Sequence, residues 1–129
     1  MKASCIFNMD DWKEAYGIYS SLLDEDPSSY TLLYYCGRCL YALERYEDAY
    51  DRFTDTLSML MLDNEVPDEM YVEIYFYIAD TAYRTGRKAQ AESYLHDGLA
   101  LDPDDEELQE LARKILPEEE AGPFNHGAR

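Results

Sequence analysis

Apolar side chains recur along this chain every three or four positions, the spacing that places them on one face of an α-helix. The clearest stretches are 12–27, 46–60 and 88–103, and in each an alanine is followed four residues later by a large side chain. The alanine and large residue of the three stretches are Ala15 and Tyr19, Ala49 and Phe53, and Ala91 and Leu95. The pattern predicts three amphipathic helices that each bury one side.

The second and third of these helices are each preceded by another segment with helical spacing, at 30–46 and 72–88. The predicted inner positions are Leu33, Cys36, Gly37 and Leu40 in the first segment, and Tyr75, Ile78, Ala79 and Ala82 in the second. Gly86 lies where the second segment should end and the chain should turn. The order of elements is therefore a first helix, a short turn and a second helix, and Asp-Pro pairs at Pro27 and Pro103 follow two of the second helices.

The spacing between the alanines indicates an internal repeat with an insertion. Ala15 and Ala49 are 34 residues apart, whereas Ala49 and Ala91 are 42 apart, so eight extra residues fall between them, within 56–70. Two interpretations remain open. A helix could be longer by about two turns, or an adaptable Met-rich surface could be formed by Met59, Leu60, Met61 and Leu62.

The small residues at the predicted helix contacts resemble those of the tetratricopeptide repeat (TPR) family. They are Gly37 and Ala79 in the first helices and Ala15, Ala49 and Ala91 in the second helices. The resemblance covers about residues 9–116, and it implies an all-α fold, a short α-solenoid of antiparallel helix pairs. It implies about two and a half TPR units, followed by a C-terminal capping helix.

We expect a helical domain over 1–116 and a disordered tail over 117–129, because the tail has Pro, Gly and charge without a period. The domain divides into a half repeat at 9–27, a repeat with the insertion at 28–66, a repeat at 69–103 and a capping helix at 104–116. The inner face of the capping helix is predicted to be Leu108, Leu111, Ala112 and Ile115.

The N-terminal copy departs from the pattern, because residues 1–8 are too short for the expected first helix. The helix at 11–24 should then leave one apolar side uncovered, near Ile6, Phe7 and Ile18. Exposed apolar patches mark association surfaces. A homodimer through this uncovered N-terminal helix is therefore one hypothesis, and a helix supplied by another molecule is the other.

Charge narrows the range of functions. The chain has 129 residues, of which 28 are acidic and 11 basic, so its formal net charge is −17. Such a charge repels phosphate backbones and anionic membrane surfaces, which argues against nucleic-acid and membrane binding. No apolar run reaches the length of a transmembrane helix, so we expect no membrane insertion. Three cysteines give no simple disulfide framework, and we expect a cytoplasmic protein.

The residues that could carry chemistry lack the context that such chemistry needs. Cys36 and Cys39 fall in the middle of a helix rather than at the N-terminus that would activate a thiol, so we expect buried packing cysteines. His96 should face outward without a histidine partner, and His126 lies in the tail. The acidic run at 102–107 lacks the central glycine of a calcium loop. We expect no metal, no cofactor and no enzymatic activity.

The TPR resemblance implies a concave binding face lined by the first helices. The inward positions would be Thr31, Tyr34, Arg38, Tyr41 and Ala42 in one copy, and Glu73, Phe76, Asp80, Tyr83 and Arg84 in the next. Aromatic side chains beside arginine form anchor sites for peptides. We predict partner contacts at Tyr34, Arg38, Tyr41, Phe76, Asp80, Tyr83 and Arg84. Packing between helices is the alternative role for the three tyrosines, and the groove should be nearly neutral.

These features favour a non-catalytic protein-interaction module or scaffold that binds a protein or peptide partner. The partner segment should be extended or helical, apolar at its anchors, and basic or neutral overall. A first alternative is a small acidic cytoplasmic chaperone of the type III secretion translocator class, which 37–49 and 87–95 resemble in rhythm. A second alternative is a regulatory or accessory subunit of a larger complex. Tyr34 and Phe76 argue against the TPR subclass that grips the C-terminal carboxylates of heat-shock chaperones.

Overall fold

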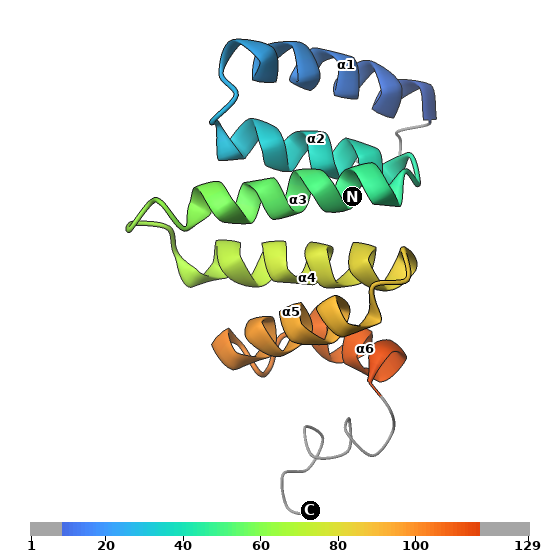
Figure 1. Ribbon diagram of the computed structural model, residues 1–129, viewed down its shortest axis with the longest axis vertical. Helices are drawn as coiled ribbons and strands as arrows, with labels where there is room; N and C mark the ends of the chain where they lie inside the picture. Colours follow the sequence, from blue (N-terminus) through green and yellow to red (C-terminus); the bar gives the residue numbers. More distant parts are fainter. Residues whose placement is uncertain (1–8, 117–129) are drawn as a thin grey trace, which may run out of the picture. The chain divides into compact units, whose positions relative to one another are not determined.

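The computed structural model describes residues 9–116, and every regular element in this range is an α-helix. In chain order the helices are α1 (Met9–Glu25), α2 (Tyr30–Ala42), α3 (Tyr46–Leu60), α4 (Asp68–Arg84), α5 (Lys88–Leu101) and α6 (Glu106–Ile115). Neighbouring helices pack against each other within each part of the chain (Figure 1). The predicted all-α fold of packed helix pairs is confirmed.

The chain divides into two compact units, with the boundary between Asn64 and Glu65. The N-terminal unit contains α1, α2 and α3, and the C-terminal unit contains α4, α5 and α6. In repeat terms, α2 and α4 are first helices, whereas α1, α3 and α5 are second helices. The predictions on residues 1–8 and 117–129, which concern Ile6, Phe7, His126 and the disordered tail, lie outside the described residues.

The turns inside the two helix pairs have the same backbone geometry. Gly86 has a positive φ of 84°, as expected for a glycine that ends a helix, and the Arg87 N–H donates to the Ala82 carbonyl. At the matching turn between α2 and α3, Glu44 has a φ of 62°, and the Arg45 N–H donates to the Leu40 carbonyl. The backbone bond therefore closes both turns, although only one of them has the glycine that favours this conformation.

The core of the N-terminal unit lies where α2 and α3 approach closely. A Cβ added to Gly37 would lie 2.7 Å from Cε1 of Phe53, so only glycine allows this contact. Phe53, Ala49 and Leu40 have no exposed surface. The side-chain hydroxyl of Ser29 caps α2 by accepting a hydrogen bond from the Leu32 N–H.

The core of the C-terminal unit forms around α5, which contacts both α4 and α6. Ala79, Ala91 and Leu95 are fully buried there. The four residues expected on the inner face of the last helix are buried as well: Leu108, Leu111, Ala112 and Ile115. The carboxylate of Asp105 caps α6 by accepting a hydrogen bond from the Leu108 N–H at 2.9 Å.

The insertion is divided over three places, so the interpretation of a helix longer by two turns is wrong. α3 runs one residue further beyond its alanine than α1 does, and α4 starts four residues earlier, relative to its small residue, than α2 does. The connection 61–67 has seven residues, against four in the connection 26–29. These differences account for the eight extra residues.

The predicted Met-rich surface needs a correction as well. Leu60 is fully buried because the apolar stripe of α3 continues through it to the last residue of the helix. Met61 and Leu62 follow the helix end and are 58% and 77% exposed. Met59 is half-buried. Of the four residues predicted to form this surface, therefore, only Met61 and Leu62 are exposed.

Candidate protein-binding site

The predicted contact residues of α2 form a local cluster. The Arg38 guanidinium donates a hydrogen bond to the Tyr34 hydroxyl at 3.0 Å, and it lies 5.7 Å from the centre of the Tyr34 ring. The centres of the Tyr34 and Phe53 rings also lie 6.1 Å apart. Tyr34 therefore combines packing between helices with a polar contact at its tip. Tyr41 makes an edge contact with Tyr46, with 5.6 Å between ring centres.

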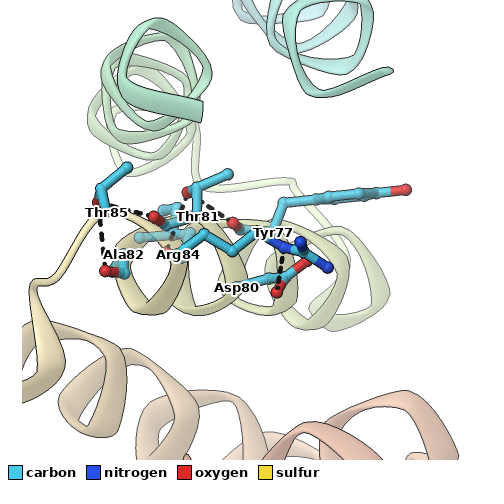
Figure 2. Close-up of polar contacts among 7 residues, drawn as sticks. Tyr77, Asp80, Thr81, Ala82, Arg84 and Thr85 are labelled. Atoms are coloured by element: carbon cyan, nitrogen blue, oxygen red, sulfur yellow. Dashed lines mark hydrogen bonds and ion pairs between the residues drawn. The ribbon is translucent and has the colours of Figure 1, made fainter. Parts of the chain in front are cut away.

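The predicted contact residues near the end of α4 include an ion pair one helical turn apart. Nε of Arg84 donates to a carboxylate oxygen of Asp80 at 3.1 Å (Figure 2). Asp80 is 5% exposed, whereas the Arg84 side chain is partly exposed. Figure 2 also shows Thr81 and Thr85, whose hydroxyls donate to the carbonyls of Tyr77 and Thr81, each at 2.8 Å. The polar groups of this part of α4 are therefore held by their own helix.

A cleft of about 460 Å³ lies within the C-terminal unit, between the first half of α4, the α5–α6 connection and the start of α6. We call it the acidic cleft, and it is lined by Asp68, Glu69, Val72, Glu73, Phe76, Tyr77, Leu101, Asp102, Asp105 and Glu107. Of the predicted contact residues, only Phe76 lines it. Glu73, which was expected to face inward beside Phe76, lines it too, whereas Asp80, Tyr83 and Arg84 do not.

The acidic cleft is charged, unlike the nearly neutral groove expected of the predicted contact residues; only Phe76 belongs to both, so the expectation for that groove stays a prediction. Six of the ten residues lining the cleft are acidic, and none is basic. Desolvation, followed by repulsion from the Glu107 carboxylate, raises the pKa of Glu73 above its usual value. No local sign in the sequence indicates this charge, because Asp102, Asp105 and Glu107 have the composition of an ordinary solvated helix start. Packing of α6 beside α4 is what brings them to Glu73.

The N-terminal unit has a smaller and more apolar cleft of about 260 Å³ between α1 and α2. It is lined by Trp12, Ala15, Tyr19, Tyr35, Arg38 and Cys39. The rings of Tyr19 and Tyr35 stack in it with 5.2 Å between their centres. Of the predicted contact residues, only Arg38 lines this cleft. A third cleft of about 380 Å³ lies on the same unit and has a mixed lining that includes Asp24, Arg52 and Asp55.

The two described cysteines are buried, as predicted. Burial raises the pKa of Cys39 to about 11 and also raises that of Cys36, so both remain thiols at neutral pH. His96 is exposed. Within residues 9–116, no group of three or more His, Cys, Asp or Glu side chains is arranged to hold a metal ion. Over the same residues, no helix combines the length and the apolar character needed to cross a bilayer.

Comparisons with known proteins agree with the repeat pattern. The model of the family described as anaphase-promoting complex, cyclosome, subunit 3, matches residues 1–56, and this is a TPR-type repeat family. A solved structure with a similar fold is that of the type III secretion chaperone SycD from Yersinia enterocolitica, in complex with a peptide of the translocator YopD. The TM-score is 0.62 at 18% identity, and the match covers 93% of this chain and 84% of SycD. No curated protein matches the chain in sequence.

Proposed function

We propose that this chain, which is built of TPR-type helix pairs, is a non-catalytic module that binds a segment of another protein in the acidic cleft. The observation that carries the proposal is the cleft itself. It places the aromatic side chains of Phe76 and Tyr77 on a first helix, beside polar groups contributed by another helix. Concave sites in which apolar and polar side chains face the same space are the usual places where proteins bind ligands. A chaperone of the same fold is bound to a peptide, which supports a peptide as the ligand.

On α4, the other predicted contact residues, Asp80, Tyr83 and Arg84, belong to the same proposal. The predicted contact residues of α2, Tyr34, Arg38 and Tyr41, are proposed as a contact surface of the N-terminal unit by itself. Arg84 is held by Asp80 and Arg38 by Tyr34, so each guanidinium loses less conformational freedom when a partner binds. Both arginines can then contribute more of their interaction energy to affinity.

A capture experiment with matched variants tests this function. The full chain, Phe76→Ala and Tyr94→Ala are each used to capture partners from an extract of the source cells, and the captured proteins are identified by mass spectrometry. Tyr94 is a half-buried aromatic residue of α5 that does not line the cleft, so it controls for the loss of a ring. We expect a partner that is lost with Phe76→Ala and retained with Tyr94→Ala. A partner retained equally by both variants would refute the cleft as its binding site.

The type III secretion translocator chaperone is the second candidate function. The fold likeness to SycD over 93% of this chain favours it. This candidate predicts that a hydrophobic secreted protein co-purifies with the chain from a host that has the secretion apparatus. The match of residues 1–56 to a family named after a complex subunit supports the third candidate, an accessory subunit, which predicts co-purification with a stable multi-protein assembly.

We also propose that two copies of the chain associate through α1. Ile18 and Leu22 lie one turn apart on this helix and are 55% and 45% exposed. Association would remove both from water, which favours a dimer. Sedimentation at micromolar concentration should give about twice the 15.0 kDa of the chain. Leu22→Asp should restore the monomer, and a wild-type chain that is already monomeric would contradict this proposal.

A further inference from the structure

The acidic cleft is lined both by apolar or aromatic side chains and by carboxylic acids. Four of its residues are apolar or aromatic, namely Val72, Phe76, Tyr77 and Leu101. The other six are carboxylic acids contributed by the first half of α4, the α5–α6 connection and α6. A fitting ligand must therefore present an apolar surface and a positive charge together.

We propose that the cleft holds an arginine side chain of the partner segment, with an aliphatic residue next to it. The inference rests on the function proposed for the same cleft and specifies the chemistry of its partner. Arginine would place its guanidinium among the carboxylates, and the neighbouring aliphatic side chain would cover Val72 and Leu101.

The charge of the cleft is the first reason. No basic side chain is among its lining residues, and the Arg84 guanidinium, further along α4, is paired with Asp80. Carboxylates gathered in a cleft repel one another; at Glu73, desolvation first and then repulsion from the Glu107 carboxylate raise the pKa. A bound cation relieves this repulsion and gains charge-assisted hydrogen bonds.

The spacing of the carboxylates is the second reason, because it excludes a simple metal ion as the cation. A divalent ion needs several oxygen ligands within about 2.6 Å of one point. Among the described residues, no three acidic, histidine or cysteine side chains converge in this way. Carboxylates spread along a cleft instead suit the several N–H donors of a guanidinium, which point in different directions.

The aromatic pair is the third reason, and it favours arginine over lysine. The rings of Phe76 and Tyr77 lie 5.2 Å apart at an angle of 72°, so they present surfaces in two directions. A guanidinium stacks on such a ring while its edge donates to carboxylates, whereas an ammonium group is a more strongly hydrated point charge. The volume of about 460 Å³ lies within the range of sites that hold side-chain-sized ligands.

An NMR titration of the full chain tests the inference with defined probes. The probe is the blocked peptide acetyl-Gly-Leu-Arg-Leu-Gly-amide, and the matched peptides carry lysine or citrulline in place of arginine. Citrulline keeps the shape of arginine and removes its charge. We expect backbone shifts at Glu73, Phe76, Tyr77 and Glu107, and an affinity for citrulline about tenfold weaker, equivalent to about 1.4 kcal/mol. The affinity of the lysine peptide should lie between those of the arginine and citrulline peptides.

Protein variants complete the experiment. The double variant Glu73→Gln with Glu107→Gln should bind the arginine peptide about tenfold more weakly. The control Glu106→Gln changes an exposed acid that does not line the cleft, and it should leave the affinity for this peptide unchanged. Circular dichroism checks that each variant is folded. Equal affinity for the arginine and citrulline peptides, shifts confined to α1–α3, or equal effects of the cleft and control variants would each overturn the inference.

The outcome separates this inference from the proposed function. If Phe76→Ala abolishes binding of the natural partner but the Glu73 and Glu107 variants still bind it, the cleft is the binding site. The inference that the cleft holds an arginine of the partner is then wrong. If Phe76→Ala leaves binding of the natural partner unchanged, the acidic cleft is not the site of the proposed function. The peptide titration then still decides whether the cleft binds arginine.

Discussion

The two units of the chain use the same helix motif in different surroundings. In the C-terminal unit, α5 lies between two helices, α4 and α6, and its Ala91 and Leu95 are fully buried. In the N-terminal unit, α1 packs mainly against α2, and its Ala15 and Tyr19 are only half-buried. The same alanine and large residue therefore lie on a helix in both units, whereas the extent to which they are buried differs.

α3 sharpens this contrast inside the N-terminal unit. Phe53 of α3 is fully buried against Gly37 of α2, whereas Tyr19 holds the same motif position in α1 and stacks on the partly exposed Tyr35. Three residues further along, Leu22 is 45% exposed and its α3 counterpart Thr56 is 1% exposed. The more apolar residue is the exposed one, which is consistent with the association proposed for α1.

The largest expected effect is the loss of the buried ring of α3. Phe53→Ala removes a fully buried side chain at the contact with α2, and it should lower the free energy of unfolding by about 3–5 kcal/mol. Tyr19→Ala should cost less than half as much, because water already reaches the Tyr19 ring. Urea unfolding of both variants measures the difference. Equal losses would show that α1 is covered as fully as α3.

The motif alanines should give the next largest effect. Ala49→Leu and Ala91→Leu place a larger side chain in a fully packed contact and should each cost about 1–3 kcal/mol. Ala15→Leu lines an open cleft, so it should stay within about 0.5 kcal/mol of the wild type. Thermal unfolding compares the three variants. If neither Ala49→Leu nor Ala91→Leu lowers the melting temperature, the repeat register is wrong.

Much of the fold could be predicted because helical periodicity and turn residues are local signals. The spacing of Ala49 and Phe53, the glycine at position 86 and the buried cysteines all act through neighbours within one or two turns. Leu60 was included in the possible Met-rich surface because the spacing of the alanines placed it within the insertion. Its position seven residues after Phe53 continued the helical stripe and was the signal that could have placed it in the core.

The candidate site could be predicted only in part, because its charge arises from packing between segments about 30 residues apart. Phe76 was found from its place on a first helix, and Glu73 shares that face. The acids at Asp102, Asp105 and Glu107 have the local composition of any helix start. Nothing in their own segment indicates that α6 would bring them opposite α4.

Replacing a glycine by alanine should destabilise the chain in α2 and stabilise it in α1, and both changes in stability should be smaller than those above. Gly37→Ala places a Cβ 2.7 Å from the buried Phe53 ring, and the steric cost of about 1–3 kcal/mol exceeds the gain in helix propensity of about 0.5–1 kcal/mol. Gly17→Ala, on α1, has nothing within 4 Å of its new Cβ, so only the gain remains. Urea midpoints measure both, and a destabilised Gly17→Ala variant would mean that a further segment covers this side of α1.

The smallest effect should come from the acidic cleft and depend on pH. Because the folded-state pKa of Glu73 is raised, the folded chain holds this proton more tightly than the unfolded chain does. That contribution to stability is complete below the ordinary pKa of 4.5 and is lost as the pH rises through the folded-state value. Glu73→Gln keeps the side chain neutral, so it should raise the urea midpoint at pH 7, and the gain should fade toward about pH 4.

A control is needed for this variant, because a chain with a net charge of −17 repels itself, and removing an unrelated exposed negative charge also lowers that repulsion. Glu14→Gln removes one exposed charge from α1, in the unit without the acidic cleft. Glu73→Gln should stabilise the chain more than Glu14→Gln does at pH 7, and the excess measures the desolvation of Glu73 together with its repulsion from Glu107. Added salt screens the general repulsion between exposed charges first, so the excess should persist at an ionic strength where the Glu14 effect has disappeared. Equal gains at every pH and salt concentration would instead assign the effect to overall charge, and the two units would then differ in packing alone.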